Sequence, residues 1–337
     1  MDWNKGFTAA CYMSVIDRDT WRDTGRIEIT GGSISRSDEG LMQSARVDCV
    51  NYDQSEERWV RIWMDARQEG AAEHVALFTG LAVSPDRDIN GRLTTNEVTC
   101  YSVLKPAKDV LLPRGWYAPA GANGAELAAR LLDVTPAPKV VEEGSPLLQN
   151  TYIAENGESN LSMAQKILEA INWRIRIEGD GTINICRKAR EVTESFDNLA
   201  NDCIEPKVRA SYDWFSAPNV FRAVKDGRSA VATDDSADSI FSTRSRRREI
   251  WKEDSNCKLN TNESLEEYAA RRLREYQNVT YSVSYDRRYH PSVMVSDLVR
   301  IHYPDQDIRG VFIIKSQSID ISRGGKTSEL GEFYGNI

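Results

Sequence analysis

Histidine is rare in this chain of 337 residues, and its cysteines never stand close together. The three histidines are His74, His290 and His302, and no two of them have His-x-x-x-His spacing. The sequence therefore has few of the residues that a zinc hydrolase or a Ser-His-Asp enzyme needs. We expect each histidine to be a strand or turn residue. The six cysteines form no Cys-x-x-Cys pair, which disfavours a zinc site and is typical of reduced thiols in a protein made in a cytoplasm.

Long apolar runs and the common nucleotide and hydrolase motifs are also missing. No run approaches the roughly 18 apolar residues of a membrane span. The opening residues, MDWNKGFTAACYMSV, lack the basic and apolar regions of a signal peptide, so we expect neither membrane insertion nor export by that route. The sequence has no Gly-x-Ser-x-Gly elbow, no phosphate-binding P-loop and no Gly-x-Gly-x-x-Gly after a strand. We therefore expect no catalytic residue and no cofactor.

The carboxylates and tryptophans of the sequence are compatible with a protein that binds or cleaves carbohydrate. A glycosidase needs only two carboxylates that face one sugar, and the chain has 51 acidic residues. Its eight tryptophans can stack on sugar rings, although their spread over different predicted elements favours core or interface positions. A carbohydrate-binding or carbohydrate-cleaving protein is thus an alternative, and it predicts affinity for glycans.

The overall composition is typical of a globular protein with several domains. Hydrophobic residues make up 40% and charged residues 28% of the chain, so neither disorder nor a fibrous repeat is needed to explain it. The length exceeds what one core usually holds, which predicts two or three domains. A net charge of -8 disfavours tight nucleic-acid binding, because an acidic surface repels phosphate.

Short strands separated by turns dominate residues 27–104. Several runs alternate apolar and polar residues, among them RIEIT, SARVDCV, ERWVRIWMD, VALFTGLAVS and NEVTCYSVL. This alternation predicts a half-buried sheet, which a β-barrel or a sandwich accommodates. Proline and glycine gather after Lys105, so we place the first domain at residues 1–105.

Residues 106–205 are predicted to form a small α/β module. The run AELAARLLDV predicts one helix, and residues 159–172 predict another with apolar residues at i, i+3, i+4 spacing and Ser159 as its N-cap. The next run, WRIRIEGDGTINICRK, has two alternating halves joined across Gly179–Gly181. A turn of such residues between alternating runs indicates a hairpin.

Strand-like sequence returns in PKVRASYDWFSAPNVFRAV and in three later runs, VTYSVSYD, LVRIHYP and GVFIIKSQSIDI. A polar stretch and the helical run ESLEEYAARRLREY lie between them. The simplest topology is a second β-domain, residues 206–229 and 278–337, with an insertion at 230–277 that contains a helix. The predicted fold class is therefore α+β and mainly β, with two β-barrel domains, an intervening α/β module and a helical insertion in the second barrel.

The sharpest motif matches a calcium-binding loop. Asp86, Asp88 and Asn90 stand at alternate positions before a glycine, and Glu97 completes the spacing of an EF-hand loop. The flanking runs are strand-like rather than helical, however, so a hairpin turn rich in Asp, Asn and Gly explains the same residues. We favour the turn and assign no metal site, although the sequence leaves both interpretations open.

A basic cluster, Arg244–Arg248, could contact phosphate. It lies in the polar stretch near three acidic residues, Asp234, Asp235 and Asp238. Short charge runs usually lie on solvated surface, so we expect a solvated loop in which the arginines pair with these acids.

Four segments carry a family resemblance. Residues 212–224, YDWFSAPNVFRAV, resemble the segment that opens the second barrel in hub proteins of phage baseplates and siphophage tail tips. HPSVMVSDLVRIHYPDQDIRGVFIIKSQSIDISRGGKTSEL resembles the closing strands of that family. FTGLAVSPDRDINGRLTTNEVTCYSVLKP resembles the hairpin that ends the first barrel, and ENGESNLSMAQKILEAINWRIRIEGDG resembles the helix and hairpin of the intervening module. The segments follow the family's order over essentially the full length.

The resemblance implies a structural role in a virion. In that family each subunit contributes two tube-like barrels, so a homotrimer presents six similar domains and adapts a sixfold tail tube to a threefold tip. The implied partners are the distal tail protein, the tail tube, the tape measure protein and tip or fibre proteins, with DNA only in transit through the channel. The implied location is the tail tip of a virion assembled in the host cytoplasm.

Two further expectations concern neighbouring proteins of such a tail. Many relatives continue into a peptidase, lectin or fibre region, whereas this sequence stops at Ile337, so we expect another chain to supply such an activity. The alternative within the tail is the distal tail protein, which forms a hexameric ring and does not require two barrels in each chain.

Overall fold

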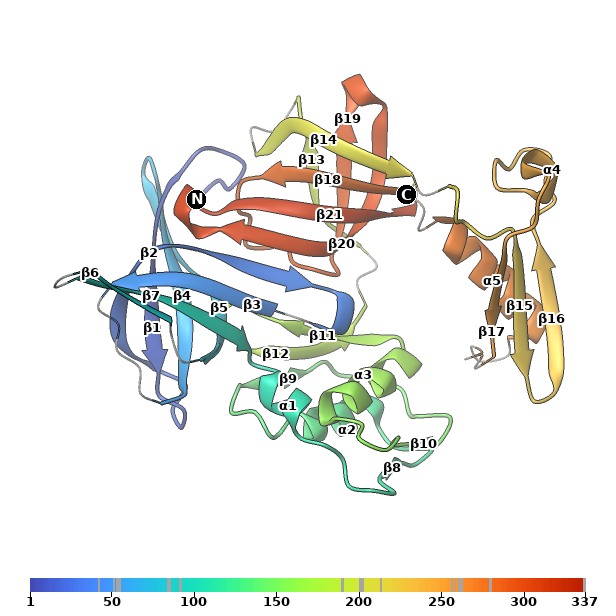
Figure 1. The fold of residues 1–337 in the computed structure, drawn as a ribbon, viewed down its shortest axis with the longest axis horizontal. Coiled ribbons are helices and arrows are strands. Elements are labelled where there is room, and N and C mark those ends of the chain that lie inside the picture. The colour runs from blue at the N-terminus through green and yellow to red at the C-terminus, as the bar shows by residue number, and fades with distance from the viewer. Residues whose placement is uncertain are drawn as a thin grey trace.

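The computed structural model describes residues 1–41, 43–50, 52, 56–83, 86–90, 93–188, 191–199, 203–212, 214–255, 257, 259, 263–278 and 281–335. It is mainly β with a few helices, as the predicted α+β class requires. Two β-units lie side by side, an α/β module packs below them, and an insertion lies at one end of the molecule (Figure 1). Among the described residues, no helix is long and apolar enough to cross a membrane.

The first β-unit contains strands β1 to β7. Strand β1 pairs with both β2 and β4, and the pairings continue through β5, β7 and β3 back to β2, so they close into a ring. Alternating apolar side chains such as Ile34, Val47, Ile62 and Phe78 fill its centre. The elements are β1 Thr8–Ile16, β2 Asp23–Ser37, a 3-10 turn at Glu39–Leu41, β3 Gln43–Val50, β4 Arg58–Gln68, β5 Ala71–Ala82, β6 Asp86–Asn90 and β7 Leu93–Ser102.

The second β-unit has its strands in the order β13-β19-β20-β21-β18-β14. Its core contains Phe196, Val283, Ile301 and Phe312. No pairing joins β13 to β14 in the described part of the chain, so a second closed barrel stays a prediction. The elements are β13 Val192–Asp197, β14 Ile204–Tyr212, β18 Tyr281–Arg287, β19 Leu298–Tyr303, a 3-10 turn at Pro304–Gln306, β20 Ile308–Asp320, a 3-10 turn at Ile321–Arg323 and β21 Lys326–Gly335.

The two β-units share one sheet, because β2 pairs with β20. Residues Ser33–Ser37 run antiparallel to Ser316–Asp320, and Figure 1 shows β2 beside β20. Eight strands follow one another without a break, β6-β7-β3-β2-β20-β21-β18-β14, and every neighbouring pair is antiparallel. We call this run the joined sheet.

The α/β module follows the first β-unit, as the sequence predicts. Ser159 caps α3 by accepting a hydrogen bond from the Ser162 amide, and the predicted hairpin is formed by β11 and β12. Helices α2 and α3 pack on this small sheet through Leu131, Ile167 and Ile185. The elements are α1 Lys105–Asp109, β8 Tyr117–Ala118, α2 Gly124–Leu131, β9 Lys139–Val141, β10 Tyr152–Ile153, α3 Asn160–Ala170, β11 Trp173–Ile177 and β12 Ile183–Arg187.

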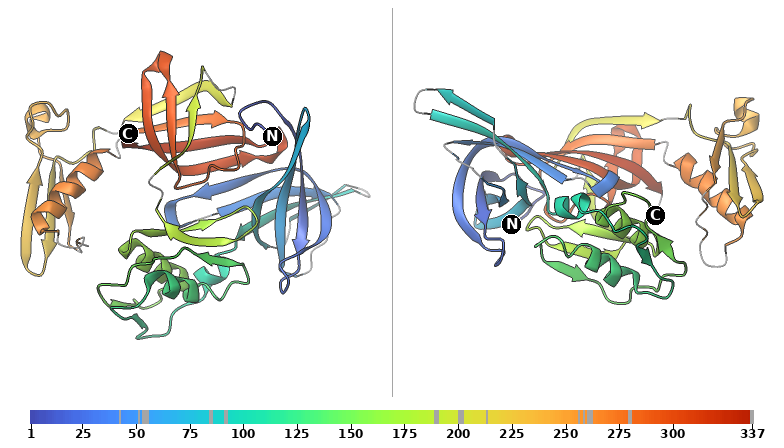
Figure 2. Two further views of the ribbon diagram at one scale, coloured as in Figure 1. Left: turned by 180° about the vertical axis from the view of Figure 1, so that it is seen from behind. Right: turned by 60° about the horizontal axis from the view of Figure 1, so that its bottom comes forward.

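The insertion is a separate small body with its own core of Phe221, Ala223, Tyr268, Ala269 and Leu273. Figures 1 and 2 show it beyond the ends of β14, β18 and β21. The elements are β15 Val220–Lys225, β16 Arg228–Thr233, α4 Thr243–Arg246, β17 Trp251–Asp254 and α5 Leu265–Asn278.

Two boundaries differ from those predicted. We placed 206–229 in the second β-unit, yet β15 pairs with β16 and β17, so the insertion begins near residue 214. We placed 106–205 in the α/β module, yet β13 pairs with β19 of the second β-unit. Strand β13 has a partner that is distant in sequence, whereas β15 forms a hairpin with the next strand, β16, inside the insertion. A strand-like run alone does not show which sheet it joins.

Candidate ring-forming surfaces

The outer face of the joined sheet is lined by serine. Ser44, Ser35, Ser318 and Ser328 are successive partners across β3, β2, β20 and β21, so one row of serines crosses the junction between the two β-units. The residues that alternate with them, such as Ile34, point into the core. The full set on this face is Ser33, Ser35, Ser37, Ser44, Ser211, Ser282, Ser284, Ser316, Ser318 and Ser328.

Several charges on this serine face lie in ion pairs. Arg46 pairs with Glu97 at 3.0 Å on the first half. On the second half Lys326 lies 2.9 Å from Asp286 and 3.0 Å from Glu205. The face therefore combines serine hydroxyls with charged side chains, and the registers also place Asp48, Asp320 and Glu332 on it. Sequence reasoning missed it, although serines at alternate positions in SISRS, SVS and SQS were a signal of one serine-lined face.

The joined sheet ends in an open edge on each side. Strand β14 pairs only with β18, and β6 pairs only with β7, within the described ranges. Because eight consecutive strands alternate in direction, β14 runs antiparallel to β6. An exposed edge presents unpaired amide and carbonyl groups, which a strand of another chain can take up.

The α/β module is locked against the first β-unit at the β11–β12 turn. Arg61 of β4 donates to the carbonyl of Asp180 at 2.9 Å, and the Thr79 hydroxyl donates to the carbonyl of Gly179 at 2.8 Å. A Cβ on Gly179 would lie 1.8 Å from the carbonyl oxygen of Ala76. Glycine is therefore required for this close approach.

The same hairpin is also locked to the second β-unit. Asp297, which is 1% exposed, accepts hydrogen bonds from Arg174 at 2.9 Å and from Arg176 at 2.7 and 2.8 Å. One carboxylate thus receives two guanidinium groups from β11, an arrangement of strong charge-assisted bonds. The β11–β12 hairpin therefore fixes both β-units, and the serine face keeps one shape.

The calcium-loop motif lies in a hairpin. Asp86–Asn90 forms β6, which pairs with β7 so that Asp86 faces Glu97, and the intervening residues 91–92 lie outside the described residues. The side chains of Asp86, Asp88 and Asn90 lie outside what the structure describes, so the choice between a turn and a calcium site stays a prediction. Within the described residues, no cluster of three or more His, Cys, Asp or Glu is placed to hold a metal.

The basic cluster pairs with acids less than predicted. Arg244 lies 3.8 Å from Asp235, and both side chains are exposed. Arg246 and Arg248 instead turn toward the loop that precedes β15, where Arg246 donates to the carbonyl of Ala217 at 2.6 Å. The difference arises because a folded loop offers carbonyl acceptors that a sequence cannot locate.

Each histidine lies on a strand or in a turn, as predicted, and each also pairs with a carboxylate. His74 contacts Asp65 at 2.6 Å, and His302 contacts Asp197 at 2.6 Å. His290 is buried in the turn after β18, 2.7 Å from the Ser292 hydroxyl and 3.4 Å from Glu194. Burial and the nearby Arg287 charge lower the pKa of His290, while Glu194 opposes them.

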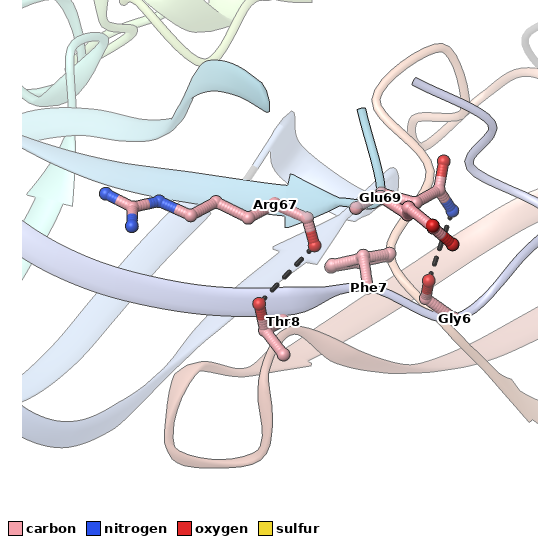
Figure 3. A pocket seen from close by; sticks show the side chains of 6 residues that line it. Gly6, Phe7, Thr8, Arg67 and Glu69 are labelled. Carbon is pink, nitrogen blue, oxygen red and sulfur yellow. Dashed lines mark hydrogen bonds between the residues drawn. The ribbon is translucent and has the colours of Figure 1, made fainter. Parts of the chain in front are cut away.

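A shallow pocket where the N-terminal segment meets the β4–β5 turn shows no catalytic arrangement. Figure 3 shows the Thr8 hydroxyl donating to the carbonyl of Arg67, and Phe7 beside it. Gln68 donates to the carbonyl of Gly6 at 3.1 Å. These contacts fasten the N-terminal segment to the end of β4, so we interpret the pocket as structural.

Comparison with solved structures finds this fold in phage tail proteins. A 43 kDa tail protein of prophage MuSo2 from Shewanella oneidensis aligns with a TM-score of 0.67 and 12% identity, over 96% of this chain and 98% of that one. A tail protein from Neisseria meningitidis MC58 gives a TM-score of 0.68 and 14% identity, over 97% and 96%. No protein-family model matches the sequence, and a search of curated proteins finds no match.

The likeness extends to a component of a secretion system. An Escherichia coli component of the type VI secretion system, described as structurally similar to the T4 bacteriophage tail proteins gp27 and gp5, gives a TM-score of 0.54 and 9% identity, over 92% of this chain and 74% of that one. The chain thus has the fold of phage tail and baseplate proteins along nearly its full length. This confirms the resemblance found in the sequence.

Proposed function

We propose that this chain, which has the fold of phage tail proteins, is a structural hub of a tail tip rather than an enzyme. Three copies would close a ring that joins the tail tube and distal tail protein on one side to tip or fibre proteins on the other. The ring would encircle the tape measure protein and later the passing DNA, in a virion assembled in the host cytoplasm. The observation that carries the proposal is the joined sheet with its two open edges.

The number and directions of the strands in the joined sheet support a closed ring. Rotation about a ring axis parallel to the strands does not change their direction, so β6 of the next copy runs the same way as β6 of the first copy. Because β6 is antiparallel to β14, the next copy's β6 can pair with β14 of the first copy as an antiparallel strand. An even number of strands in each copy is what permits this pairing all the way round. Three copies of eight strands would give a ring of twenty-four.

The same sheet supports a pseudo-sixfold arrangement. It divides at the β2–β20 pairing into two halves of four antiparallel strands, β6-β7-β3-β2 and β20-β21-β18-β14. Each half covers one core, the first with Val47 and the second with Val283. Three chains would therefore place six four-stranded halves around one pore and so match a sixfold tube.

The serine face is the surface we assign to the pore. Neutral hydroxyls and paired charges provide few fixed cations for phosphate, and the chain as a whole carries -8. DNA would then slide without being retained.

The copy number tests the hub proposal. Native mass spectrometry of the purified chain should give three copies of 38.0 kDa, about 114 kDa. Six copies, about 228 kDa, would favour the distal tail protein, and a stable monomer would contradict both. Binding to glycans that fails after substitution of a few Trp or Asp residues would instead favour a carbohydrate-directed protein.

A charge substitution tests the assignment of the pore face. Lysine in place of Ser35, Ser318 and Ser328 should create DNA binding at about 0.15 M salt that weakens steeply as salt rises, whereas the natural chain should bind none. A control adds the same charge elsewhere, with lysine at Gln149, Asn150 and Ser162 of the α/β module. Equal DNA binding by both variants, or salt-sensitive binding by the natural chain, would contradict the assignment.

A further inference from the structure

The insertion displays a groove between aromatic side chains and arginines. Trp214 is 54% exposed, Phe215 65% and Ile240 70%, which concentrates large exposed apolar residues on this small body. Ser245, Arg246 and Arg248 complete the lining. We call these six residues the arginine–aromatic groove. A contiguous exposed patch of this kind marks an interaction surface more often than chance.

The two arginines hold the aromatic residues in place. Arg246 donates to the carbonyls of Trp214 and Ala217, and Arg248 donates to the carbonyl of Phe215 at 2.9 Å. The Arg248 guanidinium also lies 4.4 Å from the centre of the Phe215 ring. The arginine side chains, the backbone of the loop and the Phe215 ring are thus held before binding and lose little entropy when a partner arrives, which is the property of interface hot spots.

The bonds to carbonyls leave the groove positively charged. A carbonyl partner does not cancel the charge of a guanidinium, and the Nε of Arg246 is buried without an acceptor within the described part of the chain. Residues 214–278 contain 12 basic and 11 acidic residues, so the rest of the chain carries -9. The groove and the remainder of the molecule are therefore complementary in charge.

The groove is too small to be an interface alone. A stable interface buries about 800 Å² on each partner, which six side chains at the tip of a loop do not supply. Trp214 lies two residues after Tyr212, the last residue of β14, and Figures 1 and 2 show the insertion beyond that end of β14. The groove therefore begins close to the end of the open-edge strand, and a chain that pairs along β14 would pass near it.

We propose that the arginine–aromatic groove docks on the acidic surface of a second copy of this chain, the same copy whose β6 pairs with β14. This inference rests on the proposed ring. The insertion then acts as a clasp outside the pore that adds contact area at each junction. Its aromatic side chains would supply apolar contact, and its arginines would pair with carboxylates of the neighbouring copy.

A matched pair of variants tests the clasp. Phe215→Ala with Arg248→Glu removes one aromatic and reverses one charge in the groove. Trp251→Ala with Arg222→Glu makes the same change at an exposed arginine–aromatic pair on β15 and β17, where the guanidinium lies 4.9 Å from the ring centre. Native mass spectra across a dilution series give the concentration at which the trimer dissociates.

The groove variant should dissociate at a concentration at least about tenfold higher than the natural chain, and the control within about twofold. Ile240→Asp, at a side chain that is 70% exposed, should weaken the trimer in the same direction without affecting the fold, which circular dichroism checks. If the natural chain is a trimer and neither groove variant weakens it, the clasp is wrong and the hub proposal stands. If the natural chain is a monomer, the hub proposal itself is wrong, and the clasp with it.

Discussion

Arg287 and Glu329 form an ion pair buried at the centre of the second β-unit. The two residues are 1% and 3% exposed, and two hydrogen bonds of 2.6 and 2.9 Å join the guanidinium to the carboxylate. Gln317 and Tyr285 also donate to Glu329. The two residues are 42 positions apart, so no local pattern in the sequence predicts that they pair. The Ser159 cap, in contrast, was predictable because capping is decided within one helical turn.

Removal of this buried carboxylate should be costly. Glu329→Gln leaves the Arg287 cation in the interior without its counter-charge, so we expect the free energy of unfolding to fall by about 3–5 kcal/mol. Glu253→Gln breaks the exposed pair with Arg222 and should cost at most about 1 kcal/mol. Urea unfolding measures both variants, and equal losses would show that the buried pair is not stabilising the sheet.

His290 predicts a loss of stability in acid. Its folded pKa is lowered by burial and by the Arg287 charge, so the unfolded chain takes up a proton more readily than the folded chain. The free energy of unfolding should therefore decrease as the pH falls below about 6.5, the usual pKa of histidine. His290→Asn should make this decrease smaller. Identical pH profiles for the natural chain and His290→Asn would contradict the assignment.

At the scale of elements, the periodicity of the sequence predicted helices and hairpins that form within a short segment, but it did not predict pairings between strands that are distant in sequence. The second predicted helix of the module, α3, and the β11–β12 hairpin appear where the sequence places them, because their patterns and caps are complete within a short window. Strand β1 was not foreseen, since TAACYMSVI alternates poorly at its start. Strand β13 was assigned to the wrong body, since its partner β19 lies about a hundred residues away. Predicting the serine face would have required the registers of six strands, which the sequence does not give.

The hairpin turn at Gly179 should tolerate no side chain. Gly179→Ala places a Cβ against the Ala76 carbonyl, so the turn must shift away from β5 and the free energy of unfolding should fall by about 1–3 kcal/mol. Gly25→Ala is the control, because a Cβ there meets no atom within 4 Å. Thermal unfolding compares the two variants. Equal melting temperatures would mean that the module is not held at this point.

At the scale of the whole molecule, the proposed function rests on one continuous sheet whose outer face is rich in serine. The α/β module fixes the two β-units through Asp180 and Asp297, so both halves of the sheet keep one curvature. Among the described strands, β6 and β14 each have one partner, so the outer side of each is open, and the insertion lies beyond the end of β14. The alternating runs of the sequence predicted the mainly β class but not this continuity, which depends on the pairing of β2 with β20.

A cryo-electron microscopy reconstruction of the purified assembly tests the central claim most directly. We expect three chains around a pore, with β14 of each copy paired to β6 of the next and serines facing the channel. A ring of six chains, separate monomers, or a trimer whose joined sheets face outward would contradict the account.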